Sequence, residues 1–270
     1  MDKIDKAARE LGEMDELAAM ASPIHALHPL AKLSVTLAYI FTVVSYDRYE
    51  LSRLWILLLY PALLYQLSGI PMSVCFRKLR AVLPLVCAVG IVNPFLDRAV
   101  LFTLWGVPVS GGMISMLTLM LKGVLCLLCS FLMAATTGMA PLCAALRKLR
   151  VPKMPVTLLL LTYRYAGVML EELSVMNTAY MLRAPGQRGI HYSAWGSFLG
   201  QLLLRTMDRG AELYNAMQLR GFDGNFSYAD CGRAGAGDWI FVMLSAAFLF
   251  LCRRYNVTEL LGVMMMGGRR

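Results

Sequence analysis

The chain has few charged residues and few of the residues on which catalytic and metal sites depend. Only 16% of its 270 residues are Asp, Glu, Lys or Arg, and there are three His; soluble domains average about 25% charged residues. We find no HExxH, GxSxG or paired-aspartate metal motif, which argues against a membrane enzyme. The GxxxxGK[ST] motif of ATP-binding loops is also absent, so any ATP hydrolysis must come from partner chains.

Cysteine and histidine do not form recognisable sites either. The seven Cys are an odd number without paired spacings, and several lie in apolar runs, where Cys behaves as a small hydrophobe. Cys126 and Cys129 have CxxC spacing but no second pair, so we expect core packing and reduced thiols. His25 and His28 have no carboxylate or thiolate beside them, and Pro29 follows directly. Interfacial packing is therefore the expectation for both, and no metal site is predicted.

Apolar residues dominate the composition. They make up 58% of the chain, against about 45–50% in soluble domains, and the mean hydropathy is +0.59. The sequence therefore predicts a membrane protein. The net charge of +9 does not indicate a nucleic-acid partner, because that function needs a basic stripe on a soluble fold. The N-terminus has no signal-peptide core and predicts a polar surface helix over 2–20.

Five apolar runs predict an all-α membrane bundle of about five transmembrane helices. A bilayer crossing takes roughly 17–25 residues, and some of the runs are at the short end of that range. They cover about 30–46, 54–70, 81–95, 113–133 and 239–252. Either of two further apolar stretches, the tail at 256–266 or residues 156–170, could form an additional transmembrane helix. Residues 99–112, AVLFTLWGVPVSGG, predict a hairpin or re-entrant piece at the outer surface.

Basic residues give the bundle an orientation. Three clusters fall on one side if each apolar run crosses the membrane once, because two runs separate each cluster from the next, and that side is the cytoplasm by the positive-inside rule. They are Lys3, Lys6 and Arg9; Arg77, Lys78 and Arg80, in a predicted link; and Arg147, Lys148, Arg150 and Lys153. Arg253, Arg254, Arg269 and Arg270 do not follow the pattern, because five spans place the C-terminus outside.

Lys122 is the candidate membrane-interior charge, since it lies within the fourth apolar run. An ionisable group at that depth is a functional candidate by default. Snorkelling and pairing with a partner helix are the alternatives, and we interpret Lys122 as an interior structural or interface charge.

A large cytoplasmic insert is predicted between the fourth and last spans. We therefore divide the chain into 1–137, a coupling region at 138–236, and 237–270. The insert opens with a basic amphipathic helix, followed by long helices over 156–183 and 194–220. On the second of these, charged side chains predict a solvated, self-paired surface; they are Arg205, Asp208, Arg209 and Glu212.

One pattern occurs twice in this insert, at the end of each long helix. Ala179 and Arg183 are four residues apart, as are Ala216 and Arg220, so each Ala shares a helix face with its Arg. A small residue allows close approach of a partner backbone, and Arg offers a rigid five-donor fork. Gly221 is expected at the C′ position of the second helix. The repetition favours a docking surface over a catalytic site; complementing the helix dipole is the alternative.

These features together resemble a known family. The stretches that carry the resemblance are SPIHALHPLAKL, NPFLDRAVLFTLWGVPVSGG, MAATTGMAPLCAALRKLRVPKMPVTLLLLTYRY, AYMLRAPG and AMQLRGFDG. Nearly the whole chain resembles the transmembrane T component of energy-coupling factor (ECF) transporters, most closely the cobalt-type branch. Two departures stand out. The family's first motif usually reads Ala-Arg-Gly where this chain has Leu182-Arg183-Ala184, with Pro185 ahead of Gly186, and Leu219 stands where Ala is common.

The resemblance implies a multi-pass protein of the plasma membrane that is not an enzyme and has no cofactor of its own. It implies two ABC ATPase subunits that bind ATP, docked by Arg183 and Arg220, with Ala179 and Ala216 allowing close approach. A membrane S component would capture the metal, with a small accessory membrane subunit as a further option, and cobalt as the substrate. A nickel or vitamin transporter of the same type and an ordinary ABC permease are the alternatives.

Overall fold

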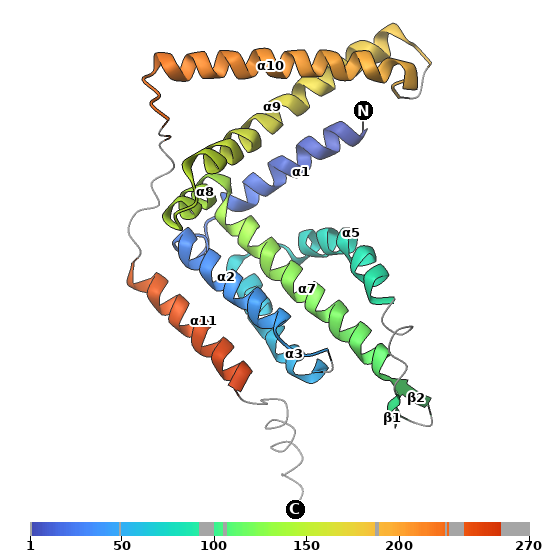
Figure 1. Ribbon diagram of the computed structural model, residues 1–270, viewed down its shortest axis with the longest axis vertical. Helices are drawn as coiled ribbons and strands as arrows, with labels where there is room; N and C mark the ends of the chain where they lie inside the picture. Colours follow the sequence, from blue (N-terminus) through green and yellow to red (C-terminus); the bar gives the residue numbers. More distant parts are fainter. Residues whose placement is uncertain are drawn as a thin grey trace, which may run out of the picture. The chain divides into compact units, whose positions relative to one another are not determined.

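The computed structural model describes residues 2–48, 50–91, 100–104, 107–186, 189–224, 226 and 235–254. The chain divides into two compact units, which we treat separately. Unit 1 contains Met1–Glu16 and Gly138–Asp230, and unit 2 contains Leu17–Thr137 and Cys231–Arg270. Figure 1 shows that the described part is helical apart from one small hairpin. The all-α membrane fold expected from the sequence is thus confirmed.

Unit 2 is a bundle of apolar helices built around α7 (Gly111–Thr137). The remaining elements are α2 (Pro29–Val44), α3 (Leu51–Leu57), α4 (Leu59–Ser68), α5 (Met72–Ile91), β1 (Val100–Leu104), β2 (Val107–Ser110) and α11 (Ala236–Arg254). Helix α7 contacts α2, α3, α4 and α5, while α11 packs on α2 and α3 (Figure 1). Strands β1 and β2 pair antiparallel between α5 and α7, which confirms the predicted hairpin.

The second apolar run forms two helices instead of one, and proline explains the break. Pro61 has no N–H, so it cannot donate to the carbonyl of Leu57, four residues earlier. Helix α3 ends at Leu57, and α4 begins after Leu58. The hydroxyl of Tyr39, a fully buried residue, donates to the Leu57 carbonyl at 3.0 Å. The core of unit 2 thus supplies the hydrogen bond that the proline removes.

The predicted basic link between the second and third runs is wrong. Residues 77–80 lie inside α5, which begins at Met72. The turn comes earlier, where α4 ends with Gly69 at its C-cap in a left-handed conformation (φ 70°), and Pro71 precedes the next helix. Glycine adopts this conformation without the steric penalty of a Cβ. The turn signal is therefore Ser68-Gly69-Ile70-Pro71, and Arg77 and Arg80 are exposed residues within a helix.

Two helices in the described part of the chain are long and apolar enough to cross a bilayer. They are α7, with a mean hydropathy of 2.1, and α11, with 1.6; α2 is apolar but shorter. Large apolar side chains of α11 face outward, as lipid-facing residues do, among them Trp239, Met243 and Phe250. The count of five spans stays a prediction, and the tail at 256–266 lies outside the described residues. Helix α9, which carries the stretch at 156–170, is not one of the two.

The helices of unit 1 are less apolar than those of unit 2. Unit 1 contains α1 (Asp2–Ala18, which runs just past the unit boundary), α8 (Met139–Lys148), α9 (Lys153–Arg183), the short 3-10 turn η1 (Tyr192–Ala194) and α10 (Trp195–Leu219). The Tyr163 hydroxyl of α9 donates to the Asp15 carboxylate of α1 at 2.8 Å. Burial, together with this carboxylate, raises the pKa of Tyr163 to about 12, so the phenol stays protonated as a donor at neutral pH.

Candidate functional site

The α10 copy of the repeat ends in a complete Schellman motif. Arg220 is the C-cap, and Gly221 follows with φ +79°. The Phe222 N–H donates to the Met217 carbonyl at 3.0 Å, and the Gly221 N–H to the Gln218 carbonyl at 2.9 Å. These are the two hydrogen bonds that define this motif, and its left-handed residue is usually glycine. The predicted C′ position of Gly221 is confirmed, so the backbone at Arg220 has one defined conformation.

The α9 copy ends less regularly. Arg183 is its last helical residue, and the C-cap Ala184 has φ −124° and ψ 66°. The Ala184 N–H donates to the Tyr180 carbonyl at 3.1 Å, after which Pro185 ends the helix. The left-handed residue, Gly186, comes one position later than in a Schellman motif, because Pro185 occupies the C′ position. The Tyr180 hydroxyl accepts the His191 N–H at 3.2 Å, which holds the following loop against the helix.

Both arginines are exposed and have no acceptor of their own. Arg183 and Arg220 make no ion pair or side-chain hydrogen bond with the residues that the structure describes. Ala216 is also exposed, and Ala179 is half-buried. A guanidinium carries five donors, and an exposed one is satisfied by water until a protein acceptor displaces that water. The guanidinium groups of Arg183 and Arg220 are therefore accessible to acceptors on another chain.

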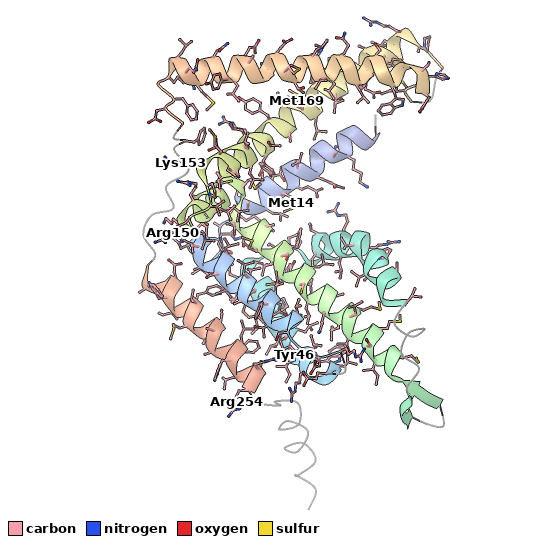
Figure 2. All side chains as sticks on the ribbon, in the orientation of Figure 1. Met14, Tyr46, Arg150, Lys153, Met169 and Arg254 are labelled. Carbon is pink, nitrogen blue, oxygen red and sulfur yellow. The ribbon has the colours of Figure 1, made fainter. Side chains whose placement is uncertain are left out.

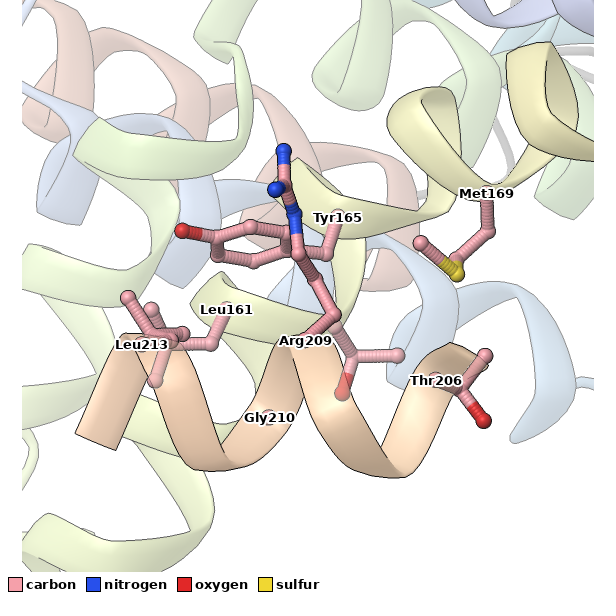
Figure 3. Close-up of a pocket in the computed structure, with 8 residues that line it drawn as sticks. Leu161, Tyr165, Met169, Thr206, Arg209, Gly210 and Leu213 are labelled. Carbon is pink, nitrogen blue, oxygen red and sulfur yellow. The ribbon is translucent and has the colours of Figure 1, made fainter. Parts of the chain in front are cut away.

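The two long helices that carry the repeat cross near their middles. A cavity of about 210 Å3 lies at the crossing. Figure 3 shows its lining, with Tyr165 and Met169 contributed by α9 and Arg209 and Gly210 by α10. The other lining residues are Leu161, Thr162, Thr206 and Leu213. Gly210 has no side chain to fill the space. The crossing is therefore packed on apolar side chains with room left between the helices, and it offers no catalytic group arrangement.

An ion pair joins the two helices beside this cavity and corrects one prediction. Arg205 of α10 pairs with Glu172 of α9, whereas the sequence predicted that the charges of α10 pair among themselves. Arg209 and Glu212 do pair on α10, at 3.6 Å. Sequence spacing reveals only neighbours on one helix. Glu172 was missed because its partner lies 33 residues away in the chain.

Lys122 caps a neighbouring helix. Its ammonium donates to the carbonyls of Tyr46 and Val44, the latter at 3.3 Å, where α2 ends. Carbonyls in the last turn of a helix have no partner within it, and the helix dipole makes this end negative. Arg253 of α11 donates to the Ser45 carbonyl and stacks over Tyr46 at the same end, near Arg254 in Figure 2. Lys122 thus has structural contacts at a helix end, and its place in the membrane interior stays a prediction.

Lys32 makes the reciprocal contact, and sequence reasoning missed it. It lies near the start of α2, is only 5% exposed, and donates to the Thr136 carbonyl in the last turn of α7 at 2.7 Å. Helices α2 and α7 are antiparallel neighbours, so each presents a lysine to the carboxyl end of the other. The only available signal was a lone Lys at the start of an apolar run.

The two candidate histidines have structural contacts. His25 accepts from the Ser22 hydroxyl at 2.7 Å and donates to the Leu17 carbonyl at 2.9 Å. His28 caps α2, where its Nδ1 accepts the Leu30 N–H at 3.1 Å. Its backbone N–H donates to the Asp238 carboxylate at the start of α11. Among the described residues, no three His, Cys, Asp or Glu side chains gather into a metal-binding group.

Comparisons with known proteins agree with this arrangement. A model of the cobalt transport protein family, CbiQ, matches residues 20–228. The cobalt transport protein CbiQ of Rhodobacter capsulatus is 34% identical over 95 residues, which cover 34% of this chain and 38% of that protein. An uncharacterized protein of Methanocaldococcus jannaschii is 28% identical over 120 residues, or 43% of this chain and 41% of that protein. The matches span about two fifths of each relative's length.

The family model covers well over half of the chain, including α2, α7 and both copies of the repeat. The match thus includes both crossed helices and much of unit 2, whereas α1 and α11 lie outside it. The chain belongs to the cobalt transport protein (CbiQ) family of membrane proteins.

Proposed function

We propose that this protein is the T component of an ECF-type importer, the membrane subunit that couples two ABC ATPases to a separate substrate-capturing S component. The observation that carries the proposal is a pair of exposed arginines, Arg183 and Arg220, at the ends of two crossed helices. Neither has an acceptor among the residues that the structure describes. On this proposal each arginine binds one ATPase, so that movement of the ATPases is transmitted along α9 and α10 to the membrane part.

The division of the chain supports this role. Unit 2 has an apolar outer surface and a core of apolar and hydrogen-bonded polar side chains, as a membrane scaffold needs. The helices of unit 1 carry the repeat and most of the exposed charge. We infer that unit 2 crosses the membrane several times and that unit 1 is cytoplasmic, because the basic residues of α8 and the α8–α9 corner favour that side.

The charges inside unit 2 argue against a cation path through this chain. Lys32 and Lys122 place ammonium groups at opposite ends of the α2–α7 pair. A divalent cation would be repelled by both, since interactions between charges are screened weakly away from bulk water. This supports a separate S component as the site of metal capture.

Cobalt is the proposed substrate. The description of the family and the name of the Rhodobacter capsulatus relative both refer to cobalt transport. A T component that serves nickel or a vitamin would have the same docking ends, because those ends contact the ATPases and not the substrate. The substrate is therefore decided by the S component.

An ordinary ABC permease is the second candidate function. Such a permease is expected to carry one short coupling helix per subunit and its own polar substrate pathway. Two long helices of 31 and 25 residues in one chain favour the T component.

The experiment is purification of the tagged, full-length chain from its native membranes in mild detergent. We expect two nucleotide-binding ABC subunits and one small membrane protein to co-purify, and the chain stripped of them to show no ATPase activity. Tight, stoichiometric binding of Co2+ to the isolated chain in a calorimetric titration would overturn the proposal. Purification without any ABC subunit would overturn it equally.

A further inference from the structure

The two copies of the repeat share a third residue besides the alanine and the arginine. Both copies read Ala-x-x-Leu-Arg, with Leu182 before Arg183 and Leu219 before Arg220. Leu182 is 78% exposed and Leu219 is 90% exposed. They are the two most exposed leucines in the part of the chain that the structure describes. A single exposed leucine needs no partner, but here the exposure recurs at two equivalent positions, each beside one of the exposed arginines.

The spacing of the motif puts the leucine and the arginine over one small residue. Ala179 is three residues before Leu182 and four before Arg183, and both separations bring side chains to the same side of a helix. Ala216 has the same relation to Leu219 and Arg220. Each helix end therefore presents an apolar group and a cationic fork side by side, with nothing large beneath them.

We propose that Leu182 and Leu219 are apolar anchors that enter a pocket on each ATPase beside the group that binds the arginine. The inference rests on the proposed function and adds to it the residue that determines how tightly each end binds. An arginine alone gives orientation but exchanges good hydration for a new hydrogen bond. A leucine moved from water into an apolar pocket supplies the larger favourable term.

The leucine and arginine of each copy indicate the chemistry of the site on the ATPase that would bind them. It consists of an apolar pocket the size of a leucine side chain, bordered by a carboxylate or by carbonyls that accept from the guanidinium. Since both copies carry the same two groups, the two ATPases are expected to present sites of the same kind. A repeat at two separate helix ends fits two discrete pockets better than a continuous membrane surface.

The two anchors are expected to differ in strength. Gly221 and the Schellman hydrogen bonds fix the backbone just after Leu219, whereas Ala184 and Pro185 leave α9 with an irregular exit after Leu182. Pre-organised groups lose less conformational freedom on binding. Leu219 is therefore the stronger anchor.

The test is a titration of the full-length chain, held in lipid nanodiscs, with the purified ABC ATPase of its complex. Leu219→Ala should weaken the Kd about ten-fold to a hundred-fold, and Leu182→Ala by less, as expected for loss of a buried leucine. Leu219→Met keeps the apolar volume and should bind within about three-fold of the unchanged chain. Leu203→Ala and Leu158→Ala are the matched controls, since these leucines are 60% and 63% exposed on the same two helices but lie outside the repeat.

The outcomes separate the inference from the function on which it rests. If both leucine variants bind as tightly as the unchanged chain while Arg220→Ala binds weakly, Leu182 and Leu219 are not anchors. The T-component function would then still stand. If the unchanged chain itself does not bind the ATPase, the function fails and the anchors fail with it. Equal losses in the Leu203 and Leu158 controls would also overturn the anchors, because the effect would not be specific to the repeat.

Discussion

Two pairs of cations at helix ends have opposite surroundings. In unit 2, Lys32 and Lys122 each donate to carbonyls at the end of a neighbouring helix. In unit 1, Arg183 and Arg220 have no acceptor among the described residues and are exposed. The lysines satisfy groups that would otherwise be unpaired inside the bundle, so they hold the fold together. The arginines contribute nothing comparable within the chain.

The contrast suggests how to tell a structural charge from a docking charge. Arginine presents a planar fork that suits a defined acceptor on a partner, whereas lysine is a compact charge that reaches carbonyls from several directions. A structural charge should affect the stability of the isolated chain, and a docking charge should affect only assembly.

Arg220→Ala should weaken ATPase binding strongly and leave the melting temperature of the isolated chain unchanged. Removing one partner of a desolvated, charge-assisted contact costs about 2–5 kcal/mol. Arg183→Ala should do the same to a smaller extent, because the α9 exit is less regular. Titration with the ATPase and thermal unfolding in detergent measure the two effects. Arg164→Ala, at an exposed position of α9 outside the repeat, is the control; a lowered melting temperature in Arg220→Ala would count against a docking role.

Lys32→Met should do the opposite of Arg220→Ala, because it should lower the stability of the isolated chain without weakening ATPase binding. It leaves the Thr136 carbonyl without its donor in a buried site, and an unsatisfied buried polar group costs about 1–3 kcal/mol. The melting temperature should fall while the folded protein still binds the ATPase normally. Lys122→Met should cost less, because Lys122 is only partly buried. An unchanged melting temperature in both variants would show that the reciprocal contacts do not stabilise the bundle.

Gly221→Ala tests whether ATPase binding depends on the backbone conformation at the C-terminal end of α10. Its expected effect is the smallest of the set. An alanine at φ +79° costs about 1 kcal/mol, from the clash of its Cβ with the backbone. Since 1.4 kcal/mol is a factor of ten, ATPase binding should weaken by about five-fold. Gly200→Ala is the control. It adds the same methyl group in open space within α10 and should stabilise the helix slightly. Equal behaviour of the two variants would mean that the exit geometry is irrelevant to docking.

The sequence predicted features set by local chemistry. The bounds of α9 and α10 and the C′ position of Gly221 follow from helix periodicity and from stop signals within a few residues. The membrane class follows from composition. Docking by Arg183 and Arg220 stays a prediction, since it concerns another chain.

Features set by tertiary contacts were missed or misread. The partners of Lys122 and the Lys32–Thr136 contact lie at least 76 residues apart in the chain, and no local pattern encodes such pairs. The Arg205–Glu172 ion pair was missed for the same reason. The basic residues of α5 predict a link only if charge alone is considered, because the turn lies earlier, at Gly69. A helix can carry exposed charges along one face without being interrupted.

The most direct test of the central claim is native mass spectrometry of the complex formed by the Arg183→Ala, Arg220→Ala double variant. The unchanged chain should retain two ATPase subunits per copy. The double variant should retain none while its melting temperature in isolation stays the same. A double variant that keeps both ATPases would contradict the account, because the two exposed arginines would then not be the docking groups.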